Sequence, residues 1–202
     1  MNPLNRQHAI REYELLVDDN AFVNAAAEDS RGPESWFNTP EKVSLLQFRA
    51  EHWIGTPFFP NSNTAGKRGG VSCQKLASAL YKETGFASIE VPEVAMSHAR
   101  FAGADSLVEK WMDGRPEFVR VSPKEPQPGD LLGFMINRVV HHLGVMVLMQ
   151  DSPKQAVPAL RVFIHTLEHS GTNYATLFDP VWGSRLAVVW RPRLDKGGLH
   201  GV

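Results

Sequence analysis

Cys73 is the one cysteine in the 202-residue chain, and its type and position make it a candidate nucleophile. It follows Ser72, a good helix N-cap, so it would occupy the first turn of a helix. The unpaired N–H groups and positive dipole of a helix start favour a thiolate and could stabilise an oxyanion on an attacked carbonyl. The alternative is that Cys73 is a small buried hydrophobic residue, which is the commoner role of a free cysteine.

A thiol nucleophile needs a base, and often a third group that orients the base. Among eight histidines, His141 and His142 open one β-rich apolar run, and His165 ends another. A histidine buried without a polar partner is costly, so neighbouring strands could pair these histidines with each other and with Cys73. Four other histidines are better explained as ordinary core or surface residues: His8, His52, His98 and His200.

The elements that must position these residues form a helical first half and a strand-rich second half. Apolar spacing and capping residues predict helices at 7–17, 40–54, 73–84 and 106–112. Alternating or continuous β-rich runs predict strands at 118–121, 131–136, 139–149, 160–166, 176–178 and 186–190. Helices first and antiparallel strands after them favour an α+β fold, with the helices packed against one sheet or partial barrel.

Two sequence features sharpen the helix boundaries. Thr39 followed by Pro40 is typical of a helix start, and Gly55 and Gly85 are typical of residues just past a helix end. Between the two central helices, residues 56–71 read as an irregular segment, and a segment of this length inside a compact domain is often functional.

Composition narrows the class of protein. The chain is 43% hydrophobic and 21% charged with a formal net charge of -1, so it can bury a core, and it lacks the basic patch of a nucleic-acid binder. Neither a signal-peptide core nor an apolar run long enough for a bilayer is visible, and a single cysteine fits a reducing compartment. We therefore expect a cytoplasmic protein as synthesised, with phage association or release by lysis or a dedicated secretion system as alternatives.

Three blocks, in order, resemble the NlpC-type cell-wall peptidases of the papain-like clan. The first comprises Ile54-Gly55-Thr56-Pro57-Phe58, Gly70-Val71-Ser72-Cys73 and Tyr81-Lys82-Glu83-Thr84-Gly85. The second comprises Pro128-Gly129-Asp130-Leu131 and His142-Leu143-Gly144-Val145. The third is Phe163-Ile164-His165. The likeness covers roughly residues 40 to 191 and implies a papain-like domain over 39–202 that follows an N-terminal extension over 1–38.

The resemblance implies that Cys73 attacks an amide or ester carbonyl, that His142 acts as base and that His165 orients His142. Four further residues are the candidate substrate-binding positions: Phe58, Ser72, Gln74 and His141. The implied function is a cysteine peptidase or amidase that cleaves peptidoglycan stem peptides or related γ-glutamyl peptides, without metal or cofactor. The expected partner is a peptide or muropeptide, neither nucleic acid nor membrane, and the oligomeric state stays open.

The sequence departs from this family close to the thiol, which keeps other functions open. Ser72 stands where the family usually has Asp, Gln74 where it has Ser, and Phe58 where Tyr is common, so the substrate could differ. The same residues would serve an acyltransferase or thioesterase, and a non-catalytic papain-like binding module is a further alternative. A Cys-His-His zinc site is also conceivable, although no short metal-ligand spacing supports it.

Overall fold

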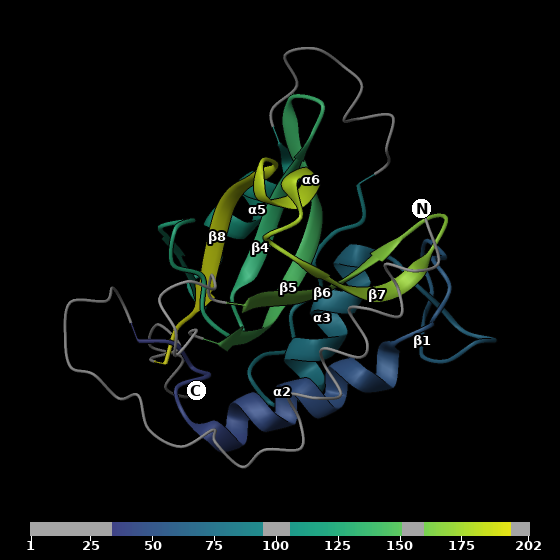
Figure 1. The fold of residues 1–202 in the computed structure, drawn as a ribbon, viewed down its shortest axis with the longest axis horizontal. Helices are drawn as coiled ribbons and strands as arrows, with labels where there is room; N and C mark the ends of the chain where they lie inside the picture. The colour runs from purple at the N-terminus through teal and green to yellow at the C-terminus, as the bar shows by residue number, and fades with distance from the viewer. Residues whose placement is uncertain (1–33, 95–105, 151–159, 195–202) are drawn as a thin grey trace, which may run out of the picture. The chain divides into compact units, whose positions relative to one another are not determined.

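The structure, a computed structural model, describes residues 34–94, 106–150 and 160–194 (Figure 1). The predicted helix at 7–17 lies outside these residues. Of the predicted extension 1–38, the last part is described, and it is tied to the sheet: Trp36 N–H donates to Pro192 O over 2.8 Å. Phe37 is buried in the core. The division after residue 38 stays a prediction.

The described chain is α+β, as predicted: helices come first and a large antiparallel sheet follows. The helices are α2 (Pro40–Trp53), α3 (Cys73–Glu83), α5 (Leu107–Asp113) and α6 (Pro180–Gly183). The main strands are β3 (Phe118–Val121), β4 (Leu131–Ile136), β5 (Val139–Gln150), β6 (Leu160–Leu167), β7 (Gly171–Thr176) and β8 (Leu186–Pro192). They form a six-stranded sheet of order β3-β8-β4-β5-β6-β7 in which neighbours are antiparallel.

Both central helices begin and end where the capping residues predict. The Thr39 side chain accepts a hydrogen bond from Lys42 N at the start of α2, and Ser72 does the same for Lys75 N at the start of α3. Gly55 and Gly85 follow the two helices with φ of 78°, which glycine adopts without strain. The N-terminal residue of α3 is therefore fixed by local sequence, and that residue is Cys73.

The sheet buries apolar side chains on both faces. The larger cluster joins α2 and α3 to one face and includes Leu80, Leu143, Val145 and Cys73. The smaller cluster lies on the other face, under α6: Leu132, Phe134, Met146, Phe163, Trp182 and Val189. Successive residues of a strand face opposite ways, so β5 contributes to both clusters. In Figure 1, α2 and α3 lie beside β5 and β6, and α6 lies near β4.

The predicted Pro-Gly-Asp turn is a structural anchor of the sheet. Arg191 of β8 donates through Nε to Asp130 Oδ1 and through Nη2 to Asp130 Oδ2, over 3.1 and 2.9 Å. Asp130 Oδ2 also accepts from Gln127 N, and Gly129 sits at a φ of 88° with Phe37 pressed against it. Both charged side chains are almost fully buried, so removing one partner would leave the other uncompensated.

Three elements differ from the prediction. The strand expected at 176–178 is instead β7 at 171–176, because Leu177 and Phe178 form the turn into α6. The short helix α6 was not predicted, although Asp179 followed by Pro180 repeats the Thr39-Pro40 starting signal. Within the segment 56–71, two short strands pair: β1 (Asn63–Thr64) and β2 (Gly70–Val71).

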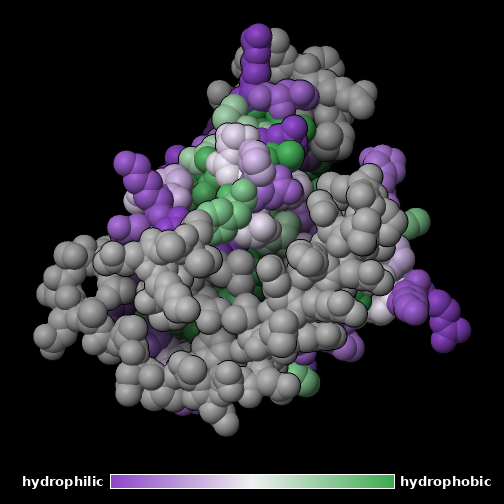
Figure 2. Space-filling model, in the orientation of Figure 1, coloured by the Kyte–Doolittle hydropathy of each residue, from purple (hydrophilic) through white to green (hydrophobic). Residues whose placement is uncertain are grey.

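The described residues expose both polar and apolar side chains. On the face drawn in Figure 2, purple hydrophilic side chains project outward, and green apolar ones lie between them. In the part of the chain that the structure describes, every helix is too short or too polar to cross a membrane.

Candidate active site

Cys73 is the first residue of α3, and its thiol meets both its own helix and the sheet. The Sγ–H group donates to Gln74 Oε1 over 3.1 Å. The backbone of Leu143, on β5, also hydrogen-bonds to the sulfur, as do the backbones of Cys73 and Gln74. The side chain is 7% exposed. The thiol therefore reaches β5 at the residue directly after His142.

Burial decides the charge state of this thiol. Desolvation raises the pKa of Cys73 to about 11, and it outweighs the backbone hydrogen bonds from Leu143, Gln74 and Cys73, which lower it. The carboxylate of Glu93 raises the pKa further. The expectation that the helix start favours a thiolate is thus not met here, because tertiary burial overrides the local N–H groups. The resting group is a neutral thiol.

The structure joins His142 and His165 directly. His142 Nε2 and His165 Nδ1 are 2.9 Å apart, and both side chains are buried. Backbone pairing of β5 with β6 runs from Gln150 opposite Leu160 to Val145 opposite Ile164 and does not reach the two histidines. Their side chains therefore connect the two strands just beyond the end of the backbone ladder.

Both histidines are neutral. Burial is the main cause that lowers the pKa of His165 to about 4, against a smaller opposite effect of its hydrogen bond to Asn173. Burial also lowers the pKa of His142 well below its usual value, and His165, His141 and Arg185 add to the effect in that order. At neutral pH each ring therefore has one nitrogen that carries a hydrogen and one that does not.

Trp182 of α6 covers the histidine pair. Its ring centroid lies 5.2 Å from that of His142 and 4.6 Å from that of His165. Phe134 and Phe163 contact the same two rings from the sheet, at 5.8 and 5.0 Å respectively. The histidine pair thus sits in an aromatic enclosure, which explains the dominant effect of burial on its pKa values.

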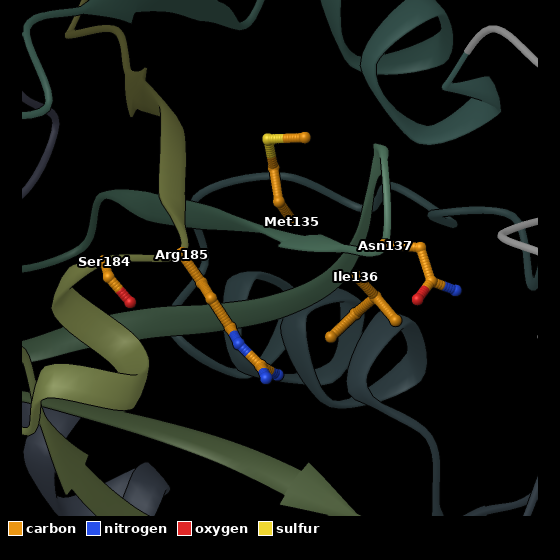
Figure 3. Close-up of a pocket in the computed structure, with 5 residues that line it drawn as sticks. All are labelled: Met135, Ile136, Asn137, Ser184 and Arg185. Atoms are coloured by element: carbon orange, nitrogen blue, oxygen red, sulfur yellow. The ribbon is translucent and has the colours of Figure 1, made fainter. Parts of the chain in front are cut away.

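A hollow of about 460 Å³ opens beside this enclosure, between the β4–β5 turn and the start of β8 (Figure 3). Its lining comprises Met135, Ile136, Asn137, Ser184 and Arg185. In Figure 3 the Arg185 side chain extends toward Ile136. The Arg185 backbone connects this hollow to the aromatic enclosure, because its N–H donates to Trp182 O over 3.1 Å and its carbonyl accepts from Met135 N over 2.8 Å.

The thiol lies beside the backbone of Leu143, the residue after His142, but it is not bonded to the His142 ring. Among the residues that the structure describes, no hydrogen bond joins Cys73 to His142; the thiol donates to Gln74 instead. Cys73 belongs to the larger apolar cluster, whereas the ring of His142 contacts Phe134 and Trp182 of the smaller one. The two side chains therefore lie in clusters on different faces of the sheet.

A carboxylate that the sequence did not reveal lies beside Ser72. The Ser72 hydroxyl donates to Glu93 Oε1, and Asn61 N donates to Glu93 Oε2 over 2.8 Å. Glu93 is half-buried and comes from the segment after α3, twenty-one residues beyond Ser72. A negative charge thus stands next to the residue that precedes the thiol, although position 72 itself is not acidic.

The other candidate substrate-binding residues lie at different depths. Gln74 is 4% exposed and accepts the thiol hydrogen bond. His141 is also buried, next to an irregularity in the β4–β5 register. Phe58 is half-buried and pairs with Val71 through a parallel bridge. The structure does not establish a substrate contact for any of them, so their roles stay predictions.

Metal ligation has little support from the geometry. In the described parts of the chain, no three His, Cys, Asp or Glu side chains are grouped so that they could hold a metal ion. The facing nitrogens of His142 and His165 are 2.9 Å apart, whereas two zinc ligands, each at about 2.0–2.1 Å from the ion, stand farther from each other in a tetrahedral site.

Sequence reasoning missed Asn173 and Trp182, which complete the histidine environment. Asn173 Oδ1 lies 3.2 Å from His165 Nε2, on the neighbouring strand and at the opposite register position. Both residues were overlooked because β7 reads as a polar turn and α6 is only one turn long. The Asp179-Pro180 pair was the available signal for the helix that carries Trp182.

A known protein structure has a fold similar to that of this chain. The chain is similar to a crystal structure of a protein of the NLP/P60 family, described as similar to lipoprotein, from Staphylococcus aureus, with a TM-score of 0.53 and 20% identity. The match covers 82% of this chain but 45% of the other, so this chain accounts for less than half the length of that protein. No protein-family profile and no curated protein sequence matches this chain.

These findings define a class. The chain has an α+β, papain-like fold of the kind seen in the NLP/P60 family, which confirms the resemblance at the level of the fold. The fold is therefore shared with that NLP/P60 family protein, while the activity, the substrate and the catalytic roles are proposals.

Proposed function

We propose that this protein is a cysteine peptidase or amidase in which Cys73 is the nucleophile, His142 the base and His165 the residue that orients the base. The observation that carries the proposal is the 2.9 Å hydrogen bond between His142 Nε2 and His165 Nδ1, next to the strand residue that contacts the thiol. A base held by a third polar group, near a thiol at a helix start, is the arrangement that nucleophilic catalysis requires. The NLP/P60 fold supports the same reaction class.

In the proposed step the Cys73 side chain turns from Gln74 Oε1 toward His142, and the thiol gives its proton to the Nδ1 atom of His142 as sulfur attacks the substrate carbonyl. A carbon–sulfur bond forms, and the tetrahedral intermediate collapses when imidazolium returns the proton to the leaving nitrogen. Water, activated by the same imidazole, then hydrolyses the thioester and frees Cys73. Because the thiol has a pKa of about 11 and His142 a lowered one, proton transfer accompanies attack rather than preceding it.

The start of α3 offers donors for the developing negative charge. Lys75 N is taken by Ser72 Oγ, and Leu76 N by the Ser72 carbonyl. The backbones of Cys73 and Gln74 instead hydrogen-bond to the sulfur. We assign these two N–H groups to the oxyanion, because they lie beside the attacking atom and are released from the sulfur when the carbon–sulfur bond forms.

We propose peptidoglycan stem peptides or related γ-glutamyl peptides as substrates, as the family resemblance implies. Two charges in the structure suit such dipolar peptides. The Glu93 carboxylate beside Ser72 could bind an ammonium group, and the Arg185 guanidinium at the hollow in Figure 3 could bind a carboxylate. Within the described residues, neither side chain has an ion-pair partner.

The test is digestion of a muropeptide mixture and of γ-glutamyl dipeptides by the wild type and by Cys73→Ala, with products identified by mass spectrometry. We expect cleavage that falls by about 10³-fold or more in the variant, with an unchanged circular dichroism spectrum. Ser122→Ala, at an exposed position just after β3, is the matched control and should cleave normally. Cleavage by a folded Cys73→Ala variant would overturn the proposal.

A second function is favoured by one observation, the buried and protonated thiol that bonds to Gln74. A non-catalytic binding module that keeps the papain-like fold would have such a thiol. It predicts peptide binding in calorimetry, equal in the wild type and Cys73→Ala, without any product. An acyltransferase or thioesterase would instead form products only from thioester or ester donors.

A further inference from the structure

We infer that Asn173 is a positioning residue that sets the proton arrangement of both histidines, so that the Nδ1 atom of His142 presents a free lone pair. The inference rests on the proposed function, because a free lone pair at this atom is what a general base needs. It adds to that function a residue from β7 that does not contact the reacting atoms. The argument follows the hydrogen bonds outward from the backbone.

The orientation of the Asn173 amide is fixed by its neighbours. Its Nδ2 group donates to the carbonyl of Gly171 over 3.0 Å and to Ser170 Oγ over 3.1 Å. A carbonyl oxygen can only accept, so the amide nitrogen must face Gly171 and the amide oxygen must face the other way. Gly171 itself has a φ of 66°, and a Cβ at this position would lie 2.6 Å from Thr56 O, so the turn fits closely against that backbone. The Asn173 amide is therefore held by hydrogen bonds to the turn between β6 and β7.

The amide oxygen then determines the proton position on His165. Asn173 Oδ1 lies 3.2 Å from His165 Nε2, and because this oxygen can only accept, Nε2 must carry the hydrogen. His165 is neutral at pH 7, since burial lowers its pKa to about 4. Its Nδ1 atom is consequently an acceptor without a hydrogen.

The position of the proton on His165 determines the position of the proton on His142. Its Nε2 atom is 2.9 Å from the bare His165 Nδ1, so Nε2 must be the donor. His142 is neutral as well, and its one proton is therefore used in this bond. Its Nδ1 atom is left with a lone pair, and among the described residues no hydrogen-bond partner occupies it. Asn173 thus acts on His142 through His165, across three neighbouring strands.

A carboxylate in place of the amide should reverse the arrangement. In Asn173→Asp the new charge would raise the pKa of His165, and protonated His165 would donate through Nδ1 to His142 Nε2. The proton of His142 would move to Nδ1 and block the base. Activity should fall by about 10²-fold or more below the raised pKa and recover above it. The exposed substitution Asn63→Asp adds the same charge elsewhere and is the control.

The experiment has two readouts. Long-range ¹H–¹⁵N correlation spectra of labelled wild type at pH 7.5 should show His142 and His165 both as Nε2–H tautomers, and Asn173→Asp should convert His142 to Nδ1–H as pH falls. The acid limb of kcat should move to higher pH in Asn173→Asp and not in Asn63→Asp. A wild-type His142 that is protonated at Nδ1, or tautomers unchanged in Asn173→Asp, would overturn the inference. The spectra need no turnover, so failure of the proposed function would be seen separately.

Discussion

Trp182 meets His165 edge to face, with ring centroids 4.6 Å apart and an interplanar angle of 88°. The same indole lies at 5.2 Å from His142. A single side chain from a one-turn helix therefore keeps water from both members of the histidine pair. This contact makes α6 part of the candidate site.

Removal of the indole should make the histidines more basic. In Trp182→Ala water would reach both rings, and because burial is the largest cause of their lowered pKa values, these should rise toward about 6.5. The acid limb of kcat/KM should move to higher pH, and histidine titration by NMR should show the same shift. Trp111→Ala on α5, where the indole stacks on Arg115, is the control. Unchanged histidine pKa values in Trp182→Ala would contradict this account.

The thiol should react slowly at neutral pH, and the charge of Glu93 should slow it further because it raises the pKa of Cys73. We expect Cys73 alkylation by iodoacetamide to rise with pH toward an inflection near the pKa of about 11. Glu93→Gln removes a nearby negative charge and should lower the inflection. Glu90→Gln is a matched control, because Glu90 is exposed and pairs with Lys75 at 3.9 Å. An inflection below the free-thiol value of about 8.5 in the wild type would show that burial does not govern the thiol.

Stability should fall in mild acid because of His165. Its folded-state pKa of about 4 is lower than that of the unfolded chain, so below pH 6.5 the unfolded state binds the proton first. The free energy of unfolding should therefore decrease by about 1.4 kcal/mol per pH unit from this residue as pH falls toward 4. Urea unfolding at pH 7 and pH 5 measures the effect. His165→Gln should have a shallower dependence, and an equal dependence would refute the assignment.

Gly144 should be required for the approach of β6 to β5. A Cβ at this position would lie 2.6 Å from Phe163 Cδ2 and 3.2 Å from Ile164 O. We expect Gly144→Ala to cost about 1–3 kcal/mol and to lower activity by displacing the strand that carries His165. Gly114→Ala, whose nearest contact would be an ordinary 3.5 Å, should be close to neutral. Urea denaturation curves and activity assays of both variants test this prediction. Equal free energies of unfolding of the two variants would contradict it.

Local signals in the sequence were enough for the frame of the site but not for its electrostatics. Ser72 predicted the start of α3, and the apolar runs predicted β4 and the two strands that carry the histidines, β5 and β6. The thiol pKa could not be predicted, because burial of Cys73 depends on β5, seventy residues away in the sequence. Asn173 was missed for a related reason: its partner is defined by strand register, which a polar strand does not reveal.

The turn between β6 and β7 has a consequence for how the chain tolerates insertions. Strand pairing places Leu167 opposite Gly171 and His165 opposite Asn173. A shift of the register by one residue would bring Thr172 or Tyr174 opposite His165 and turn the amide to the other side of the sheet. Most surface turns accept a change in length at little cost. An insertion in this turn that shifts the register would instead remove the amide from His165.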